Sequence, residues 1–117
     1  MRVSRVTTNL HVSDIDLARD FFTGWLGLAT EEFNLGWVAR FSSPETGEHV
    51  QLVTADATAP EDSAMTVRVD DVDAAYDEAR TRGFEIVHPL VTEPWGVRRF
   101  FVRVPGGPVL NIAQEHR

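Results

Sequence analysis

Apolar and polar residues alternate over residues 3–12, the pattern of a strand that buries one face. The spacing then changes to that of a helix over residues 15–25, with Ser13 or Asp14 as its N-cap. The predicted apolar face of this helix consists of Ile15, Ala18, Phe22 and Trp25. Three short strands are expected to follow, near residues 28–33, 36–42 and 48–54.

The same pattern occurs a second time in the chain. Val12-Ser13-Asp14-Ile15-Asp16 recurs as Val69-Asp70-Asp71-Val72-Asp73, at an offset of 57 residues. A repeat of half a chain indicates two copies of one supersecondary unit. The second copy is expected to form a strand, a helix and three strands, near residues 64–70, 71–82, 84–88, 97–104 and 108–114.

The repeat and the length of 117 residues together predict one compact domain, residues 1–117. Within it we expect an α+β fold of two tandem βαβββ modules, residues 1–56 and 62–117. The groove where two such modules meet is a natural place for a ligand.

A turn containing Pro44 and Gly47 predicts a hairpin in the first module. We expect this hairpin to place Ala39 opposite Gln51 and Phe41 opposite His49. In that register Trp37 and Phe41 lie on the same face as Gln51 and His49, because strand side chains alternate between the two faces.

In the second module Arg99, Phe101 and Arg103 share a strand face with Asn111, and Trp95 rises from the loop before that strand. Aromatic, amide and imidazole side chains suit a flat, partly polar organic molecule. The alternative is that the aromatic residues fill the interior and leave no cavity. The predicted ligand-binding residues are Trp37, Phe41, His49, Gln51, Trp95, Arg99, Phe101 and Asn111.

The charge and composition narrow the possible partners. Eleven basic and eighteen acidic residues give a net charge of -7, which argues against nucleic acid and is compatible with a cationic ligand or with solubility alone. There is no cysteine, so thiol chemistry and disulfides are excluded. The N-terminus lacks a signal-peptide core and no apolar run approaches ~18 residues, so we expect a cytoplasmic protein with no membrane partner.

Several motifs of the chain are landmarks of a known family. They are Leu10-His11-Val12-Ser13-Asp14, Phe21-Phe22 with Leu26-Gly27-Leu28, Val69-Asp70-Asp71-Val72, and the segment Glu93-Pro94-Trp95-Gly96-Val97-Arg98 followed by the turn Pro105-Gly106-Gly107. With these motifs the repeat resembles the vicinal oxygen chelate superfamily, which includes glyoxalases, bleomycin-resistance proteins and ring-cleaving dioxygenases. The resemblance covers nearly the whole chain, and the segment that begins at Glu93 is similar to the bleomycin-resistance branch in particular. The resemblance implies a curled mixed sheet that forms a cup, and a homodimer.

Metal-dependent members of that superfamily supply ligands at positions that match Thr7, Gln51, Ala64 and Asn111 here. Alanine has no donor atom, threonine is an uncommon ligand, and neutral amides bring no charge to a divalent ion. The resemblance therefore implies a protein without a metal or other cofactor. A metal site rebuilt elsewhere would use histidines, and the candidates are His49, on the strand face of Gln51, and His11, on the strand face of Thr7.

Two functions remain open from the sequence. The favoured one is a non-catalytic antibiotic-resistance protein that sequesters an aromatic or cationic compound in a cleft at or beside the interface of a homodimer, as the resemblance implies. Exposed strand edges and faces are most often covered by such a symmetric dimer. The alternative is a lyase, isomerase or dioxygenase acting on a small metabolite, with His49 as the neutral-pH proton carrier.

Overall fold

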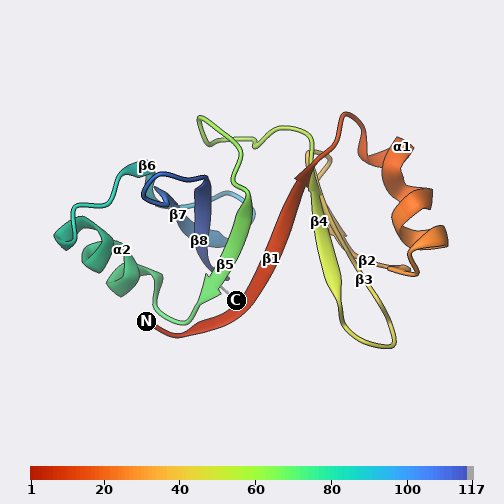
Figure 1. Ribbon diagram of the computed structural model, residues 1–117, viewed down its shortest axis with the longest axis horizontal. Coiled ribbons are helices and arrows are strands. Elements are labelled where there is room, and N and C mark those ends of the chain that lie inside the picture. The colour runs from red at the N-terminus through yellow and green to blue at the C-terminus, as the bar shows by residue number, and fades with distance from the viewer. Residues whose placement is uncertain (116–117) are drawn as a thin grey trace. The chain divides into compact units, whose positions relative to one another are not determined.

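The structure is a computed structural model that describes residues 1–115 (Figure 1). Over these residues it contains eight strands, two α-helices and a short π-helix. The chain divides into two compact units. We call Thr7–Asp62 the N-terminal unit, and Met1–Val6 with the described residues from Ser63 onward the C-terminal unit. The predicted α+β class is confirmed, and so is the βαβββ order of elements in each half of the chain.

The N-terminal unit packs a helix on one face of a four-stranded sheet. The strands have the order β2-β3-β4-β1, with β1 and β4 parallel and the other pairs antiparallel. The hydrophobic core lies between helix and sheet and consists of Ile15, Ala39, Phe41, Val50 and Leu52. The elements are β1 (Val3–His11), of which residues 3–6 belong to the C-terminal unit, α1 (Ile15–Asp20), the π-helix η1 (Phe21–Trp25), β2 (Thr30–Asn34), β3 (Val38–Ser42) and β4 (His49–Val53).

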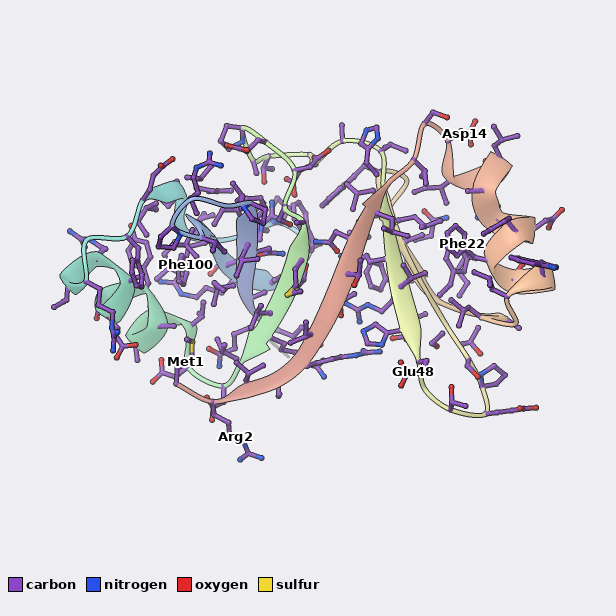
Figure 2. All side chains as sticks on the ribbon, in the orientation of Figure 1. Met1, Arg2, Asp14, Phe22, Glu48 and Phe100 are labelled. Atoms are coloured by element: carbon purple, nitrogen blue, oxygen red, sulfur yellow. The ribbon has the colours of Figure 1, made fainter. Side chains whose placement is uncertain are left out.

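Helix α1 begins at Asp14, whose carboxylate accepts a hydrogen bond from the Leu17 amide at 3.1 Å. It then widens into η1, where the Leu26 amide donates to the Phe21 carbonyl five residues back. The wider turn rotates later residues relative to an α-helix. Phe22 keeps its contact with the core (Figure 2), whereas Trp25 is 74% exposed. The prediction that Trp25 faces the core is therefore wrong.

The C-terminal unit repeats this arrangement with strand order β5-β8-β7-β6 and α2 against one face (Figure 1). Helix α2 has Asp71 as its N-cap, which accepts from the Ala74 amide at 3.0 Å. The core consists of Val67, Val69, Val72, Ala75, Ala79, Phe100 and Ile112. The elements are β5 (Met65–Val69), α2 (Val72–Thr81), β6 (Ile86–Thr92), β7 (Val97–Arg103) and β8 (Val109–Glu115).

The register between β3 and β4 differs by one residue from the prediction. Arg40 lies opposite Gln51, and Phe41 lies opposite Val50. The connection closes with a hydrogen bond from the Ser43 amide to the Glu48 carbonyl at 2.8 Å, which fixes this pairing. A slip of one residue moves every side chain to the other face. Phe41 consequently points into the core, and the charged Arg40 shares the face of Gln51.

Candidate ligand-binding face

A row of four side chains crosses the C-terminal sheet on the face opposite α2. His88 of β6 pairs with Phe101 of β7, Phe101 with Asn111 of β8, and Asn111 with Thr66 of β5. We call these four residues the C-terminal row. The predicted alignment of Phe101 and Asn111 on one face is confirmed. His88 lies within strand β6, which continues to Thr92, beyond the end at residue 88 that the sequence predicts.

Arg99 lies beside this row and is almost completely buried. Its guanidinium carbon is 4.8 Å from the centre of the Phe101 ring and 5.1 Å from that of Trp95. One of its nitrogens donates to Glu93 at 3.2 Å, and both side chains are 3% exposed. The carboxylate offsets the buried positive charge, and the two rings add cation–π attraction.

The loop between β6 and β7 positions both Glu93 and Trp95. The Gly96 amide donates to the Glu93 carbonyl at 3.0 Å, and the Glu93 amide donates to the Val97 carbonyl at 2.8 Å. Gly96 has a φ of 89°, a conformation that side chains rarely adopt. This turn directs Glu93 inward, while Trp95 stays half-buried above Arg99.

His88 and Asn111 have hydrogen-bonding capacity that the described residues do not use. Within residues 1–115 neither ring nitrogen of His88 has a hydrogen-bond partner, and Nε2 is 3.7 Å from Glu93 Oε1. Asn111 donates to Thr66 Oγ1 at 3.2 Å, but its own side-chain oxygen has no donor there. A buried polar atom without a partner costs about 1–3 kcal/mol, so a group that satisfies it gains affinity.

The N-terminal unit carries a corresponding row of Arg40, Gln51 and Asn9. Arg40 Nε donates to Gln51 Oε1 at 3.1 Å, and Gln51 Nε2 donates to Asn9 Oδ1 at 3.0 Å. Arg40 also pairs with Glu32 at 3.5 Å and lies over the Phe33 ring at 4.8 Å. Here the side chains satisfy one another.

Among the predicted ligand-binding residues, the structure brings Trp95, Arg99, Phe101 and Asn111 together in the C-terminal unit. Gln51 lies on the polar face of the N-terminal unit. His49, on the same strand face as Gln51, has its Nε2 2.7 Å from Thr7 Oγ1. The other two predicted residues lie elsewhere in that unit: Phe41 is in its core, and Trp37 is half-buried just before β3.

Sequence reasoning missed two members of the cluster, His88 and Glu93. Two register shifts interrupt the pairing of β6 with β7, one on either side of His88. Counting alternate residues across such bulges does not predict which face a side chain takes. In the sequence, Glu93 stands out only as the residue before the Pro-Trp-Gly motif, and its contact with Arg99 is not predicted. A glutamate directly before that tight turn was the available signal.

Four positions of this chain match metal ligands of metal-dependent superfamily members, and at three of them the side chains do not fit a divalent ion. The Gln51 oxygen already accepts from Arg40, whose positive charge would repel a cation. The Thr7 hydroxyl is engaged with His49, and Ala64 has no donor. Among residues 1–115, no three or more His, Cys, Asp or Glu side chains are grouped so that they could hold a metal.

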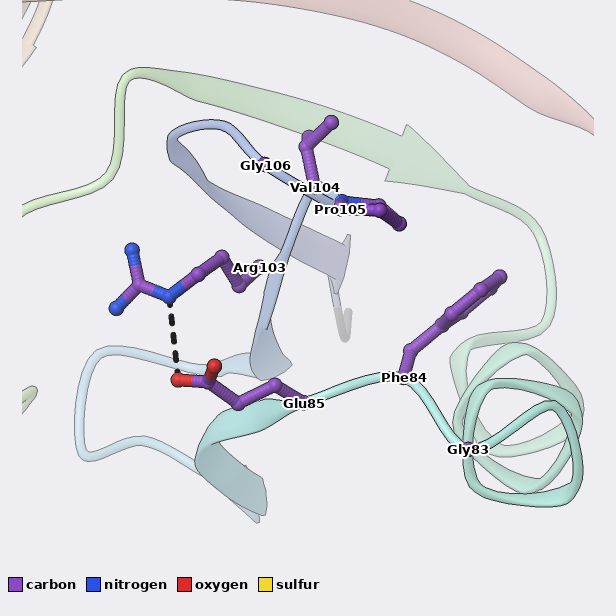
Figure 3. Close-up of a pocket in the computed structure, with 7 residues that line it drawn as sticks. All are labelled: Gly83, Phe84, Glu85, Arg103, Val104, Pro105 and Gly106. Carbon is purple, nitrogen blue, oxygen red and sulfur yellow. Dashed lines mark hydrogen bonds and ion pairs between the residues drawn. The ribbon is translucent and has the colours of Figure 1, made fainter.

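A separate surface depression of about 240 Å³ lies beside the turn that follows α2 (Figure 3). The ion pair between Arg103 and Glu85, 3.1 Å apart, borders one side, and Phe84 borders another. Arg103, which the sequence placed in the predicted cup, therefore has its charge balanced at this site. The depression is smaller than the ~300–1,000 Å³ of typical ligand pockets, and we do not assign a ligand to it.

None of the described helices is both long and apolar enough to cross a membrane.

Comparison with known proteins finds solved structures with a similar fold. The chain aligns with three solved structures over at least 95% of its length. One is described as an NAD-dependent benzaldehyde dehydrogenase from Legionella pneumophila, with 18% identity, 99% of that chain covered and a TM-score of 0.75. Another is methylmalonyl-CoA epimerase from Mycobacterium tuberculosis, with 21% identity, 90% covered and a TM-score of 0.73.

The third is a glyoxalase/bleomycin resistance protein/dioxygenase superfamily member from Vibrio splendidus 12B01, with 18% identity, 100% covered and a TM-score of 0.70. At these identities the likeness extends to the fold alone. No curated protein matches the chain. A family model matches residues 3–112, and the chain accordingly belongs to the Glyoxalase/Bleomycin resistance protein/Dioxygenase superfamily.

Proposed function

We propose that this protein binds and sequesters a small, planar, partly polar organic molecule without a metal, at the C-terminal row. The observation that carries the proposal is the unused hydrogen-bonding capacity of His88 and Asn111 on either side of Phe101. A ligand that donates to Asn111 Oδ1 and bonds to His88 satisfies both atoms. In the unliganded protein these buried groups lack hydrogen-bond partners, at a cost in free energy. A ligand that supplies the partners removes this cost and binds more tightly as a result.

The charge of the cluster bears on the class of ligand. Arg99 is neutralised by Glu93, and Arg103 by Glu85, so the two arginines present no unbalanced positive charge to a cationic compound. The net charge of -7 favours the approach of such a compound. An aromatic ligand with a basic group would therefore meet no net repulsion from these two arginines.

Access to the row requires movement, because His88 and Asn111 are 7% and 8% exposed. The four-residue loop Glu93–Gly96 is the adjacent segment with a half-exposed aromatic side chain, Trp95. We propose that this loop shifts when a ligand enters and that Trp95 stacks on the bound molecule. Aromatic stacking of this kind contributes about 0.5–1.5 kcal/mol beyond the area buried.

A thermal-shift panel of glycopeptide and aromatic antibiotics, bleomycin included, tests the proposal. We expect at least one compound to raise the melting temperature of the natural protein, since a ligand that binds the folded state stabilises it. The same compound should have little effect on Asn111→Leu, which keeps the number and branching of the side-chain heavy atoms and loses both the acceptor and the donor. If no compound shifts the natural protein, or if both proteins shift equally, the proposal fails.

The alternative function, a lyase or isomerase acting on a small metabolite, is favoured by one observation. His88 lies 3.7 Å from Glu93 in a buried setting, and such pairs serve as proton carriers when a substrate is within reach. His49, the proton carrier expected from the sequence, is engaged with Thr7. Incubation of a binding compound in D₂O separates the two functions: deuterium incorporated at carbon indicates catalysis, and its absence indicates binding alone.

A further inference from the structure

The two units of the chain differ strongly in charge. Residues 7–62 contain ten acidic and two basic side chains, a net charge of -8, whereas the rest of the chain contains eight acidic and nine basic side chains, a net charge of +1. The N-terminal unit therefore carries all of the excess negative charge of the protein. Such an asymmetry between two parts of a chain is typical of a surface that meets an oppositely charged partner.

The same unit exposes a cluster of apolar side chains on α1 and η1. Leu17, Phe21 and Trp25 follow one another at intervals of four residues and are 79%, 53% and 74% exposed. The Phe21 and Trp25 ring centroids are 5.1 Å apart, and Leu26 extends the cluster at 47% exposure. Phe22, by contrast, packs on the core of the unit (Figure 2). We call Leu17, Phe21, Trp25 and Leu26 the α1 patch.

The repeat within the chain indicates that folding does not require the α1 patch. At the offset of 57 residues, its first three members correspond to Ala74, Glu78 and Arg82. Glu78 and Arg82 form an exposed ion pair at 3.8 Å, so the same face of the α2 region is an ordinary solvated surface. With ~150–250 Å² for each aromatic side chain, the α1 patch exposes on the order of 400 Å². Exposed apolar patches of about 300–600 Å² often have a function in binding.

An acidic row runs beside the α1 patch. Successive residues of an α-helix are about 100° apart, so Asp16 and Asp20 lie next to the apolar stripe on the helix surface. Arg19, the basic residue of α1, is 2.6 Å from Asp16 and 3.0 Å from Glu31. Its single positive charge is shared between these two carboxylates. The surroundings of the patch are therefore net acidic.

We propose that the α1 patch binds an amphipathic helix of a different protein, with lysine or arginine residues beside the apolar row of that helix. Apolar side chains at intervals of four residues are suited to helix–helix packing. An apolar helix face laid on an apolar surface is also a recurrent mode of peptide recognition. The basic flank of the partner would meet Asp16 and Asp20. The interface would bury roughly 800 Å² over both partners, the size of a weak and transient contact.

The charge of the N-terminal unit disfavours the other surfaces available to cover the patch. Two copies of the chain would bring two units of net charge -8 together, and like charges across an interface lower the affinity. An anionic lipid surface would be repelled for the same reason. The proposal does not depend on the proposed ligand site, because that site lies on the C-terminal unit.

Calorimetric titration with synthetic peptides tests the proposal. The probe is a peptide of about 18 residues with leucines on one helix face and lysines on the other, which is long enough to form a helix. A comparison peptide keeps the leucines and has glutamate in place of every lysine. We expect the lysine peptide to bind with a micromolar Kd and the glutamate peptide to bind at least ten-fold more weakly. Raising the salt concentration from about 0.05 M to about 0.5 M should weaken binding of the lysine peptide.

The apolar part of the site is tested at constant net charge by Leu17→Ala/Phe21→Glu/Trp25→Arg, which carries the corresponding α2 residues. We expect this triple variant to bind the lysine peptide at least ten-fold more weakly. Circular dichroism checks that the variant is folded. Leu17→Ala alone changes the most exposed side chain of the patch and should weaken binding at least three-fold, so the test remains decisive if the triple variant does not fold.

The acidic part is tested by Asp16→Asn/Asp20→Asn, which keeps the apolar patch and should weaken binding of the lysine peptide at least three-fold. The matched control is Glu45→Gln/Glu48→Gln, which removes the same number of charges from the β3–β4 connection. Glu48 lies at the end of that hairpin, away from α1 (Figure 2). The control should bind with nearly the affinity of the natural protein.

Four results would overturn the proposal. The first is no binding of the lysine peptide, or equal binding by the natural protein and the folded triple variant. The second is equal affinity for the lysine and glutamate peptides. The third is a natural protein that sediments as a dimer and a triple variant that sediments as a monomer, which would assign the patch to a second copy. The fourth is co-sedimentation with phospholipid vesicles that the triple variant loses, which would assign the patch to a membrane.

Discussion

The polar rows of the two units have the same place in the same topology and differ in how their side chains are satisfied. In the N-terminal unit Arg40 lies opposite Gln51 and supplies a donor to its oxygen. In the C-terminal unit Phe101 lies opposite Asn111, and the corresponding oxygen has no donor among residues 1–115. The residue opposite the amide, Arg in one row and Phe in the other, gives the Gln51 oxygen a donor and leaves the Asn111 oxygen without one among residues 1–115.

The buried arginine of the C-terminal unit, Arg99, lies two residues before Phe101 on the same strand face. Arg99 lies over Phe101 and Trp95 and pairs with Glu93, so its charge is used within the protein. Arg40 instead reaches across its sheet to a neighbouring amide. The comparison indicates that the N-terminal row serves stability, and we propose that the C-terminal row serves recognition.

The largest loss of stability is expected from Glu93→Gln. This substitution removes the negative charge of Glu93 from its pair with the buried Arg99, and breaking a buried pair in this way costs about 3–5 kcal/mol. Chemical denaturation measures the loss. The matched control is Asp73→Asn, which removes the partner of the exposed Arg98 and should change stability far less. Near-equal losses in the two variants would show that Glu93 does not stabilise Arg99.

The next largest change in stability is expected from a pair of variants that compares the two rows. Gln51→Leu leaves both Arg40 and Asn9 without their shared partner and should cost about 1–3 kcal/mol. Asn111→Leu loses one bond to Thr66 but also removes an unsatisfied oxygen, so its stability should stay within about 1 kcal/mol of the natural value. Denaturant titrations of both variants give the comparison. A greater loss of stability in Asn111→Leu than in Gln51→Leu would contradict the comparison.

Trp95→Ala should change stability less than binding. Trp95 is half-buried in a loop, whereas removal of a buried core aromatic costs about 3–5 kcal/mol. We expect the melting temperature to fall by only a few degrees and ligand-induced quenching of tryptophan fluorescence to disappear. Phe100→Ala, in the core beside Tyr76, provides the contrast and should unfold readily. If the Trp95 variant fails to fold, Trp95 is a packing residue.

The smallest effect on the melting temperature is expected from treatment that removes metal ions. Because Gln51 is bonded to Arg40 and Ala64 has no donor, treatment with a chelator should leave the melting temperature unchanged. Elemental analysis of the purified protein should find no stoichiometric transition metal. About one zinc, iron, nickel or manganese ion per chain would contradict this.

The sequence predicted much of the fold because its repeat and its periodicities are local signals. The order of elements followed from them, and so did Asp14 as one of the two candidate N-caps of the first helix. Three features depended on geometry that a residue count does not contain. The π-turn displaced Trp25, the closing pair of the β3–β4 turn shifted the register by one, and two bulges brought His88 onto the polar face.

The candidate site was predicted in part for the same reason. Phe101 and Asn111 were placed together because β7 and β8 pair without interruption. Phe41 was assigned to the wrong face because the register of its hairpin was one residue off. The ion pair of Glu93 with Arg99 joins a loop to a strand, and no periodicity predicts such a contact.

The central claim, that the C-terminal row is the ligand-binding face, is tested most directly by NMR. A ¹⁵N-labelled sample is titrated with the antibiotic that gives the largest thermal shift, and amide resonances are followed residue by residue. We predict that the perturbed amides cluster in the C-terminal unit, at His88, Phe101, Asn111 and the Glu93–Gly96 loop. Perturbations confined to β3 and β4 of the N-terminal unit would contradict the account.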